Sequence, residues 1–282
     1  MRIPASKCQI IALLWLVVIA PVSFAAGAGL EDTLLSHLRD LSTFDSRVTG
    51  YPGAAAAADL IEARLRAAGS DTVYRRPIRV PVPVERGAVI VVDDVTYPLY
   101  GVWPNLVRTP TTDPDGLAGR LVYAGHARPG EVNSTDLQGA IVLLEYDCAG
   151  DWVRVFDAGA AAVVFLAAES GDPVDKAHRS EGSVHFLSTS ADMPRFYAEA
   201  DEASQLRRAA PAVVARLTGR MDWRQVEAPT LVAVVTGAEP ERRREAVVVA
   251  SYYDAISPVP ALAPGADQAS GVTTSSLSRS SR

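Results

Sequence analysis

The sequence predicts an α/β fold in which a strand-rich stretch interrupts a domain of helices and strands. Two observations carry this prediction. Apolar residues recur at helical spacing over residues 30–41 and again over 54–68, whereas from residue 73 onward the chain changes to short β-branched runs broken by proline and glycine. Helical patterning then returns around residues 194–210 and is followed by further strand patterns. Strand-rich material bracketed by helical material indicates an insert within an α/β domain.

The two N-terminal helices rest on simple signals. Leucines line one face of residues 30–41, which predicts an amphipathic helix. Alanine, the strongest helix former, dominates the start of residues 54–68, and Gly69 is a natural terminator for that helix. Residues 45–53 between the helices have the composition of a loop.

The expected strands share short runs of apolar or β-branched residues. They lie at residues 89–92, 121–123, 141–145, 160–166, 213–217, 231–235 and 247–250. A helix is expected to end at residues 157–159, directly before the fourth of these strands.

Bulk composition indicates a folded protein without a nucleic-acid partner. Of 282 residues, 48% are hydrophobic and 21% are charged, as in globular proteins. The formal net charge is −6 and no long basic run occurs, which argues against nucleic-acid binding. The short run Arg242–Arg244 is interpreted as a solvated loop before a strand.

The first 25 residues have the pattern of a signal peptide. Arg2 and Lys7 precede an apolar stretch over residues 10–22, and small residues follow up to Ala25. The apolar stretch is shorter than a membrane-spanning helix prefers, so cleavage after Ala25 is favoured over a retained membrane tether. The protein is therefore expected to be exported, to the periplasm or the extracellular space, or to remain anchored to the membrane.

Cysteine usage fits export without disulfides. Cys8 would leave with the signal peptide, and Cys148 would then be the single cysteine of the mature chain. One cysteine cannot form an internal disulfide.

The last residues lack any structural periodicity. Residues 273–282 consist mainly of serine, threonine and arginine, and a disordered tail is expected there. The α/β domain is accordingly expected to be cut short, as in a truncated or frameshifted product.

Three blocks of sequence belong together. They are residues 45–50 with the helix that ends at Gly69, residues 121–125 with 136–144 and 158–165, and residues 247–254 with 264–271. In combination they resemble the di-zinc aminopeptidases of metallopeptidase family 28, which includes bacterial leucyl aminopeptidases and carboxypeptidase Q. The second block is similar to a protease-associated domain, a small β-rich module that is often inserted in these enzymes.

The resemblance implies an incomplete zinc-peptidase-type α/β/α sheet domain that is interrupted by a protease-associated domain. The implied divisions are a signal peptide at 1–25, the first part of a peptidase-like domain at 26–79, the protease-associated domain at 80–225, the start of the peptidase-like core at 226–272 and the tail at 273–282.

The resemblance also implies positions for a zinc site. Family members carry His-x-Asp at the end of a strand, where the histidine binds zinc and the aspartate orients its ring. Tyr252 takes the histidine position and Asp254 the aspartate position, and Asp267 matches the aspartate that bridges both zinc ions. A neutral phenol, with a pKa of about 10, is a poor zinc ligand beside imidazole. Asp254 is equally well explained as the polar end of a strand, and Asp267 as a turn residue.

Other candidate sites have weaker support. His178 and His185 flank Glu181 but lack a third ligand at zinc spacing, and His37 and His126 do not match any family ligand. No Gly-x-Ser-x-Gly turn supports a serine hydrolase.

Two hypotheses follow. The chain is an exported zinc aminopeptidase-like protein without catalytic residues, for which the resemblance implies zinc as cofactor although zinc is not expected to bind. Alternatively, it is a non-catalytic module whose protease-associated domain binds a peptide or a partner protein.

Overall fold

The computed structural model describes residues 26–105, 108–131, 137–168, 191–242, 245–255 and 257–262. The chain divides into two compact units, residues 1–37 and 38–282. The predicted signal peptide, His178 and His185, Asp267 and the predicted tail lie outside the described residues. None of the described helices combines the length and the apolar character that a membrane crossing requires.

Both predicted N-terminal helices are confirmed. The described α-helices are α1 (Ala26–Ser42), α2 (Pro52–Ala67), α4 (Trp152–Asp157) and α6 (Ala200–Ala209). The described 3₁₀ helices are η1 (Ala149–Asp151), η2 (Pro240–Arg242) and η3 (Pro260–Leu262). Gly69 has a φ of +84°, a left-handed conformation that glycine adopts without strain, and α2 ends just before it.

Within the described residues, seven strands form one closed barrel in the order β1-β2-β6-β5-β4-β3-β7. Their bounds are β1 (Thr72–Val92), β2 (Val95–Gly101), β3 (Leu117–Tyr123), β4 (Ile141–Glu145), β5 (Ala162–Leu166), β6 (Arg195–Ala198) and β7 (Ala212–Val234). Strands β3 to β6 run parallel, whereas β1, β2 and β7 close the barrel through antiparallel pairs. The mixture of parallel strands and helices confirms the predicted α/β class.

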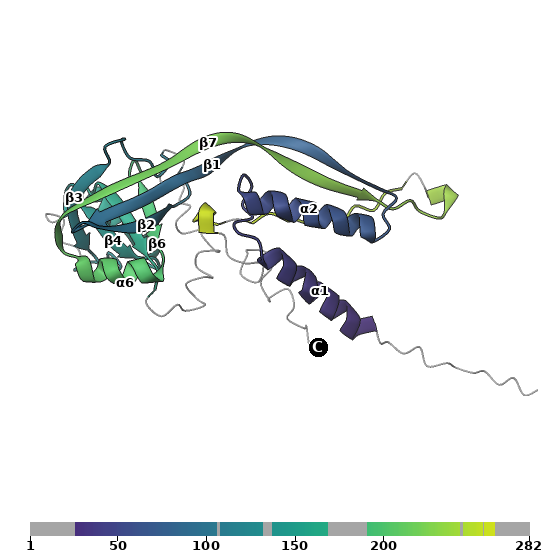
Figure 1. The fold of residues 1–282 in the computed structure, drawn as a ribbon, viewed down its shortest axis with the longest axis horizontal. Coiled ribbons are helices and arrows are strands. Elements are labelled where there is room, and N and C mark those ends of the chain that lie inside the picture. Colours follow the sequence, from purple (N-terminus) through teal and green to yellow (C-terminus); the bar gives the residue numbers. More distant parts are fainter. Residues whose placement is uncertain are drawn as a thin grey trace, which may run out of the picture. The chain divides into compact units, whose positions relative to one another are not determined.

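Strands β1 and β7 are much longer than the barrel needs. Their pairing continues outward from Glu85↔Met221 to Thr72↔Val234, and we call this outer ribbon the arm. The arm and α2 lie side by side (Figure 1), and Arg75 on β1 donates hydrogen bonds to Asp59 and Glu62 on α2. The boundaries expected at residues 79/80 and 225/226 fall inside these two strands, which cross them without a break. The division into an insert and a surrounding domain stays a prediction.

Glu85 lies where the arm joins the barrel. The β1–β7 register shifts between Glu85 and Ala88, so the ladder is irregular at this point. Glu85 Oε1 accepts a hydrogen bond of 3.0 Å from the Gly101 amide, and the Glu85 amide donates one of 3.1 Å to the Tyr51 hydroxyl. Glu85 Oε2 is buried and has no hydrogen-bond partner among the described residues. Burial raises the pKa of Glu85 to about 7.

The hydrophobic core is built from the barrel strands together with buried side chains of α4 and α6. Every residue of β5 is buried, and so is every residue of β4 except the last. The Tyr146 ring contacts Phe165 and Tyr197 edge-on, with ring centroids 6.1 Å and 5.2 Å apart. Strands that are buried on both faces read as continuous apolar runs, which explains why 141–145 and 160–166 were predictable.

Three expectations about secondary structure are wrong. Residues 195–198 form β6 and only 200–209 are helical, because the four residues are buried and pair with β5 and β2. Residues 213–217 and 231–234 are in a strand as expected, but they belong to the single strand β7 and not to two strands, because the residues between them pair with β1 along the arm. Residues 247–250 do not form a strand.

Candidate functional site

Two segments that are far apart in the sequence meet in the structure. Val48 and Ala255 form a parallel β-bridge, and the Ala255 amide donates a hydrogen bond of 3.0 Å to the Arg47 carbonyl oxygen. The first segment belongs to the 45–50 block and the second follows the 247–254 block, so the fold brings two of the three blocks together. We call residues 46–49 with 252–255 and 257–260 the junction.

Asp254 is held in place by the first segment. The Thr49 hydroxyl donates a hydrogen bond of 2.8 Å to Asp254 Oδ2. Arg47 is buried, with 4% of its surface exposed, and its Nη1 donates a hydrogen bond of 2.9 Å to the Tyr253 carbonyl oxygen. Burial lowers the pKa of the Arg47 guanidinium, and the negative charge of Asp254 opposes that shift. Asp254 thus serves as the counter-charge and hydrogen-bond acceptor of this segment.

The two adjacent tyrosines differ in their surroundings. The Tyr253 hydroxyl donates a hydrogen bond of 2.6 Å to the Pro229 carbonyl oxygen in the arm, and burial raises its pKa. Tyr252 is 94% exposed. The residue at the position that the resemblance assigns to a zinc-binding histidine therefore points into solvent.

At residues 257–260 of the junction, backbone carbonyl oxygens accept hydrogen bonds from two other loops. The Ser46 hydroxyl donates to the Pro260 carbonyl oxygen, and the Trp103 amide donates to the Pro258 carbonyl oxygen at 2.7 Å. Ser257 is fully buried, and its hydroxyl accepts a hydrogen bond from the Val259 amide. The Ser46 contact thus joins the two segments of the junction, and the Trp103 contact ties the junction to the loop after β2.

A cavity of about 450 Å³ lies beside the junction. Thr49, Tyr51 and Tyr253 line it together with Arg75 and Glu227 from the arm. Aromatic rings, a hydroxyl group and one charge of each sign give it the mixed lining that small-molecule and peptide sites share.

The donor set of the junction does not fit a zinc ion. Among the described residues, no three histidine, cysteine, aspartate or glutamate side chains lie close enough together to hold a metal. Tyr252 offers a neutral phenol, and Asp254 already accepts from Thr49. Asp267, the third predicted site residue, lies outside the described residues.

Arg47 and Thr49 were given no role in the sequence-based prediction. Both lie in the 45–50 block, whose resemblance to the opening of the peptidase domain was the available signal. Neither a buried arginine nor a threonine that contacts an aspartate 205 positions away can be identified from local patterns.

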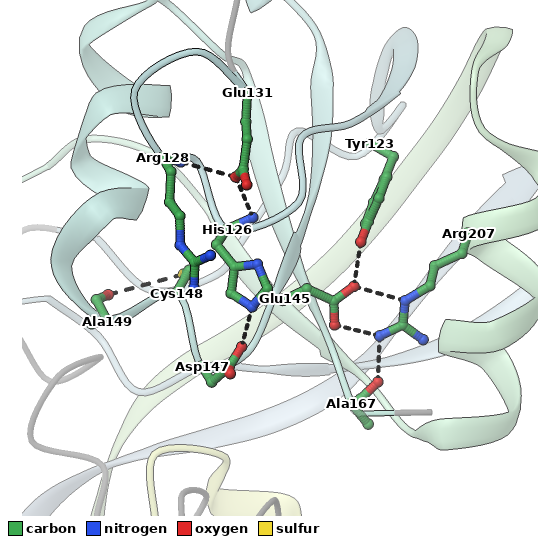
Figure 2. Close-up of polar contacts among 10 residues, drawn as sticks. All are labelled: Tyr123, His126, Arg128, Glu131, Glu145, Asp147, Cys148, Ala149, Ala167 and Arg207. Atoms are coloured by element: carbon green, nitrogen blue, oxygen red, sulfur yellow. Dashed lines mark hydrogen bonds and ion pairs between the residues drawn. The ribbon is translucent and has the colours of Figure 1, made fainter. Parts of the chain in front are cut away.

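A second polar cluster lies on the barrel, at the carboxyl ends of β3 and β4 (Figure 2). Arg207 on α6 donates to both carboxylate oxygens of Glu145 at 2.8 Å and 2.6 Å, and the Tyr123 hydroxyl donates to Glu145 at 2.7 Å. His126 Nε2 lies 2.9 Å from Asp147 Oδ1. We call these residues the barrel-end cluster. Tyr123 is 44% exposed and the His126–Asp147 pair is partly exposed beside it, so this edge is a second candidate binding surface.

Cys148, beside this cluster, is not an activated nucleophile. It is a free, buried cysteine, and burial raises the pKa of its thiol to about 12. Reactive cysteines require a lowered pKa.

Comparisons with known proteins show similarity in fold. No family model matches the chain, and no curated protein matches it. A zinc aminopeptidase from Bacillus subtilis is similar in structure, with a TM-score of 0.50 and 18% identity, over 70% of this chain and 45% of that chain. A peptidase M28 precursor from Shewanella amazonensis SB2B has a TM-score of 0.46 and 15% identity, over 70% of this chain and 49% of that chain. An aminopeptidase from Aneurinibacillus sp. strain AM-1 has a TM-score of 0.41 and 17% identity, over 72% of this chain and 47% of that chain.

The chain thus spans less than half the length of each of these proteins. At this identity the likeness is one of fold, and the predicted resemblance to zinc aminopeptidases is confirmed at that level.

Proposed function

We propose that this chain is an exported zinc aminopeptidase-like protein that does not hydrolyse peptide bonds. The observation that carries the proposal is which residues occupy the zinc-ligand positions of the junction. Asp254 is fixed by Thr49 as a residue supporting a metal ligand would be, yet the ligand position holds the exposed phenol of Tyr252. The similarity in fold to a zinc aminopeptidase supports the family-level part of the proposal.

A substitution at the ligand position tests this proposal. Tyr252→His introduces an imidazole two residues before Asp254, and it should raise zinc affinity in a calorimetric titration by about tenfold or more. Tyr252→Phe is the matched control, and it should bind zinc as the wild type does. The wild type should release no chromophore from leucine p-nitroanilide. Hydrolysis by the wild type that a chelator abolishes would contradict the proposal.

The barrel favours a second candidate function, which is binding of a peptide or a partner protein. Its barrel-end cluster presents Tyr123, which is 44% exposed, and the His126–Asp147 pair at the surface. Glu145 and Arg207 hold the hydroxyl of Tyr123 in one position, so the surface is preorganised.

Peptide titration tests the second candidate. A library of short peptides of defined sequence should contain binders for the wild type, and His126→Ala should weaken their binding by about tenfold. His37→Ala is the control, since His37 lies in the other unit of the chain. Equal binding by the wild type and His126→Ala would contradict a site at the barrel-end cluster.

Export forms part of the proposal and rests on the pattern of residues 1–25. Expression in a bacterium with two membranes, followed by fractionation, should place the chain outside the cytoplasm. Mass spectrometry of the mature N-terminus then distinguishes cleavage after Ala25 from a retained membrane tether.

A further inference from the structure

The most exposed apolar residues of the described chain are concentrated in one short stretch. Val247, Val248 and Val249 are 94%, 83% and 92% exposed, and Tyr252 is 94% exposed. We call Ala246–Tyr252 the apolar segment. No strand of the described residues pairs with it. Ala255, three residues after the end of the segment, is bridged to Val48.

The composition of the apolar segment is that of a buried strand. Ala246–Tyr252 contains no charged residue, no proline and no glycine, and β-branched and aromatic side chains dominate it. Consecutive valines place apolar groups on both faces of an extended chain. Such a segment with unpaired edges is a template for pairing with another strand.

We propose that the apolar segment pairs with the same segment of a second copy of this chain, as antiparallel strands. Antiparallel pairing centred on Val249 sets Val248 opposite Ala250 and Val247 opposite Ser251. Apolar and small residues therefore face each other along the whole pair, and no like charges meet within it.

Charged residues flank the segment and are complementary in this arrangement. Arg244, which lies outside the described residues, and Asp254 are equally far from Val249 in the sequence, and Glu245 is as far from it as Tyr253. A two-fold pair consequently sets Arg244 of each copy opposite Asp254 of the other, and Glu245 opposite Tyr253. This reciprocity is what an isologous contact between identical chains requires.

The junction prepares the segment for this contact. Its carboxyl end is fixed by the Ala255–Arg47 backbone hydrogen bond and by the contact between Thr49 and Asp254. An anchored strand loses less freedom on pairing than a free one, because part of its ordering is already complete. The inference is independent of whether the chain binds zinc or peptide.

Sedimentation velocity over a concentration series of the full chain provides the test. The wild type should form a dimer whose fraction rises with concentration. Val248→Lys puts like charges near the centre of the pair and should weaken association by about tenfold or more. Val235→Lys is the control, since Val235 is a 76% exposed valine outside the segment. Residues 1–25 are identical in all three proteins, so association through them would not distinguish the variants.

Hydrogen exchange separates a second copy from other occupants of the segment. Protection of the 247–251 amides should increase with protein concentration in the wild type and be lost in Val248→Lys. Protection that does not depend on concentration would mean that the chain's own residues cover the segment, and it would overturn the proposal. A wild type that stays monomeric, or association that Val248→Lys leaves unchanged, would also overturn it.

Discussion

Strand β5 and the apolar segment have nearly the same sequence texture and opposite surroundings. Ala162–Leu166 is fully buried between β4 and β6, whereas Val247–Val249 is almost fully exposed. Both are short runs of valine and alanine with an aromatic residue close by. The barrel supplies β5 with a neighbour on each edge and a packed core, and the described residues supply the apolar segment with neither. A run of apolar residues therefore predicts a segment that is stabilised by burial. Whether the segment is buried depends on the neighbouring strands that the rest of the fold supplies.

The sharpest way to test this contrast is to shorten one side chain in each region. Phe165→Ala leaves a cavity beside Tyr146 in the barrel core and should lower the free energy of unfolding by about 3–5 kcal/mol. Val248→Ala in the apolar segment should change it by less than about 0.5 kcal/mol. Both variants are compared with the wild type by urea unfolding at a protein concentration where the chain is monomeric. Similar losses for the two variants would contradict the assigned difference in burial.

The ion pair at the barrel end should have the next largest effect. The side chains of Arg207 and Glu145 are only 10% and 14% exposed. Arg207→Met leaves a largely buried carboxylate without its cation and should cost about 3 kcal/mol of unfolding free energy.

The double variant Arg207→Met/Glu145→Gln is the control for this pair. It removes the unpaired charge and should recover part of the loss. A single variant as stable as the wild type would show that solvent reaches Glu145.

The pH dependence of stability should report on the joint between arm and barrel. Burial raises the pKa of Glu85 in the folded chain to about 7, from an ordinary value near 4.5. The folded state therefore binds this proton more tightly than the unfolded state. Its contribution is fully present below pH of about 4.5 and is lost as the pH rises through about 7. The loss should amount to about 1–3 kcal/mol.

Glu85→Gln keeps the shape of the side chain but does not titrate. Urea unfolding between pH 5 and pH 8 should show a smaller decrease in stability for this variant than for the wild type. Parallel pH profiles for the two proteins would contradict the burial of Glu85.

The smallest of these effects is expected at the anchor of the apolar segment. Thr49→Val removes the hydroxyl that donates to Asp254 and should destabilise the chain by about 1 kcal/mol. Thr49→Ser keeps a donor at the same position and should retain most of the stability. Equal behaviour of the valine and serine variants in thermal unfolding would mean that this hydrogen bond contributes nothing.

The sequence predicted the elements whose signals are local. Residues 141–145 and 160–166 are continuous apolar runs, and the helix before Gly69 has a strong propensity and a clear stop signal. The arm was missed because proline, arginine and glutamate interrupt its apolar residues, and because its two strands gain stability from pairing with each other from Thr72↔Val234 to Glu85↔Met221. β6 was predicted as helix because four residues are too few to establish a period.

The candidate site divides in the same way. Tyr252 and Asp254 were identified by resemblance, since their motif is contiguous in the sequence. The partners of Asp254 were not identified, because Arg47 and Thr49 are far from it in the sequence and come close to it only in the folded chain. The ion pair between Glu145 and Arg207, which are 62 positions apart, was invisible for the same reason.

The metal content of the purified chain is the most direct test of the proposed function. The chain is dialysed against buffer free of chelator, and zinc and protein are then quantified by elemental analysis. The junction offers a phenol where a zinc site needs an imidazole, so we expect far less than one zinc ion per chain. Two zinc ions per chain, the content of a two-metal peptidase site, would contradict the account and restore the hypothesis of an active aminopeptidase.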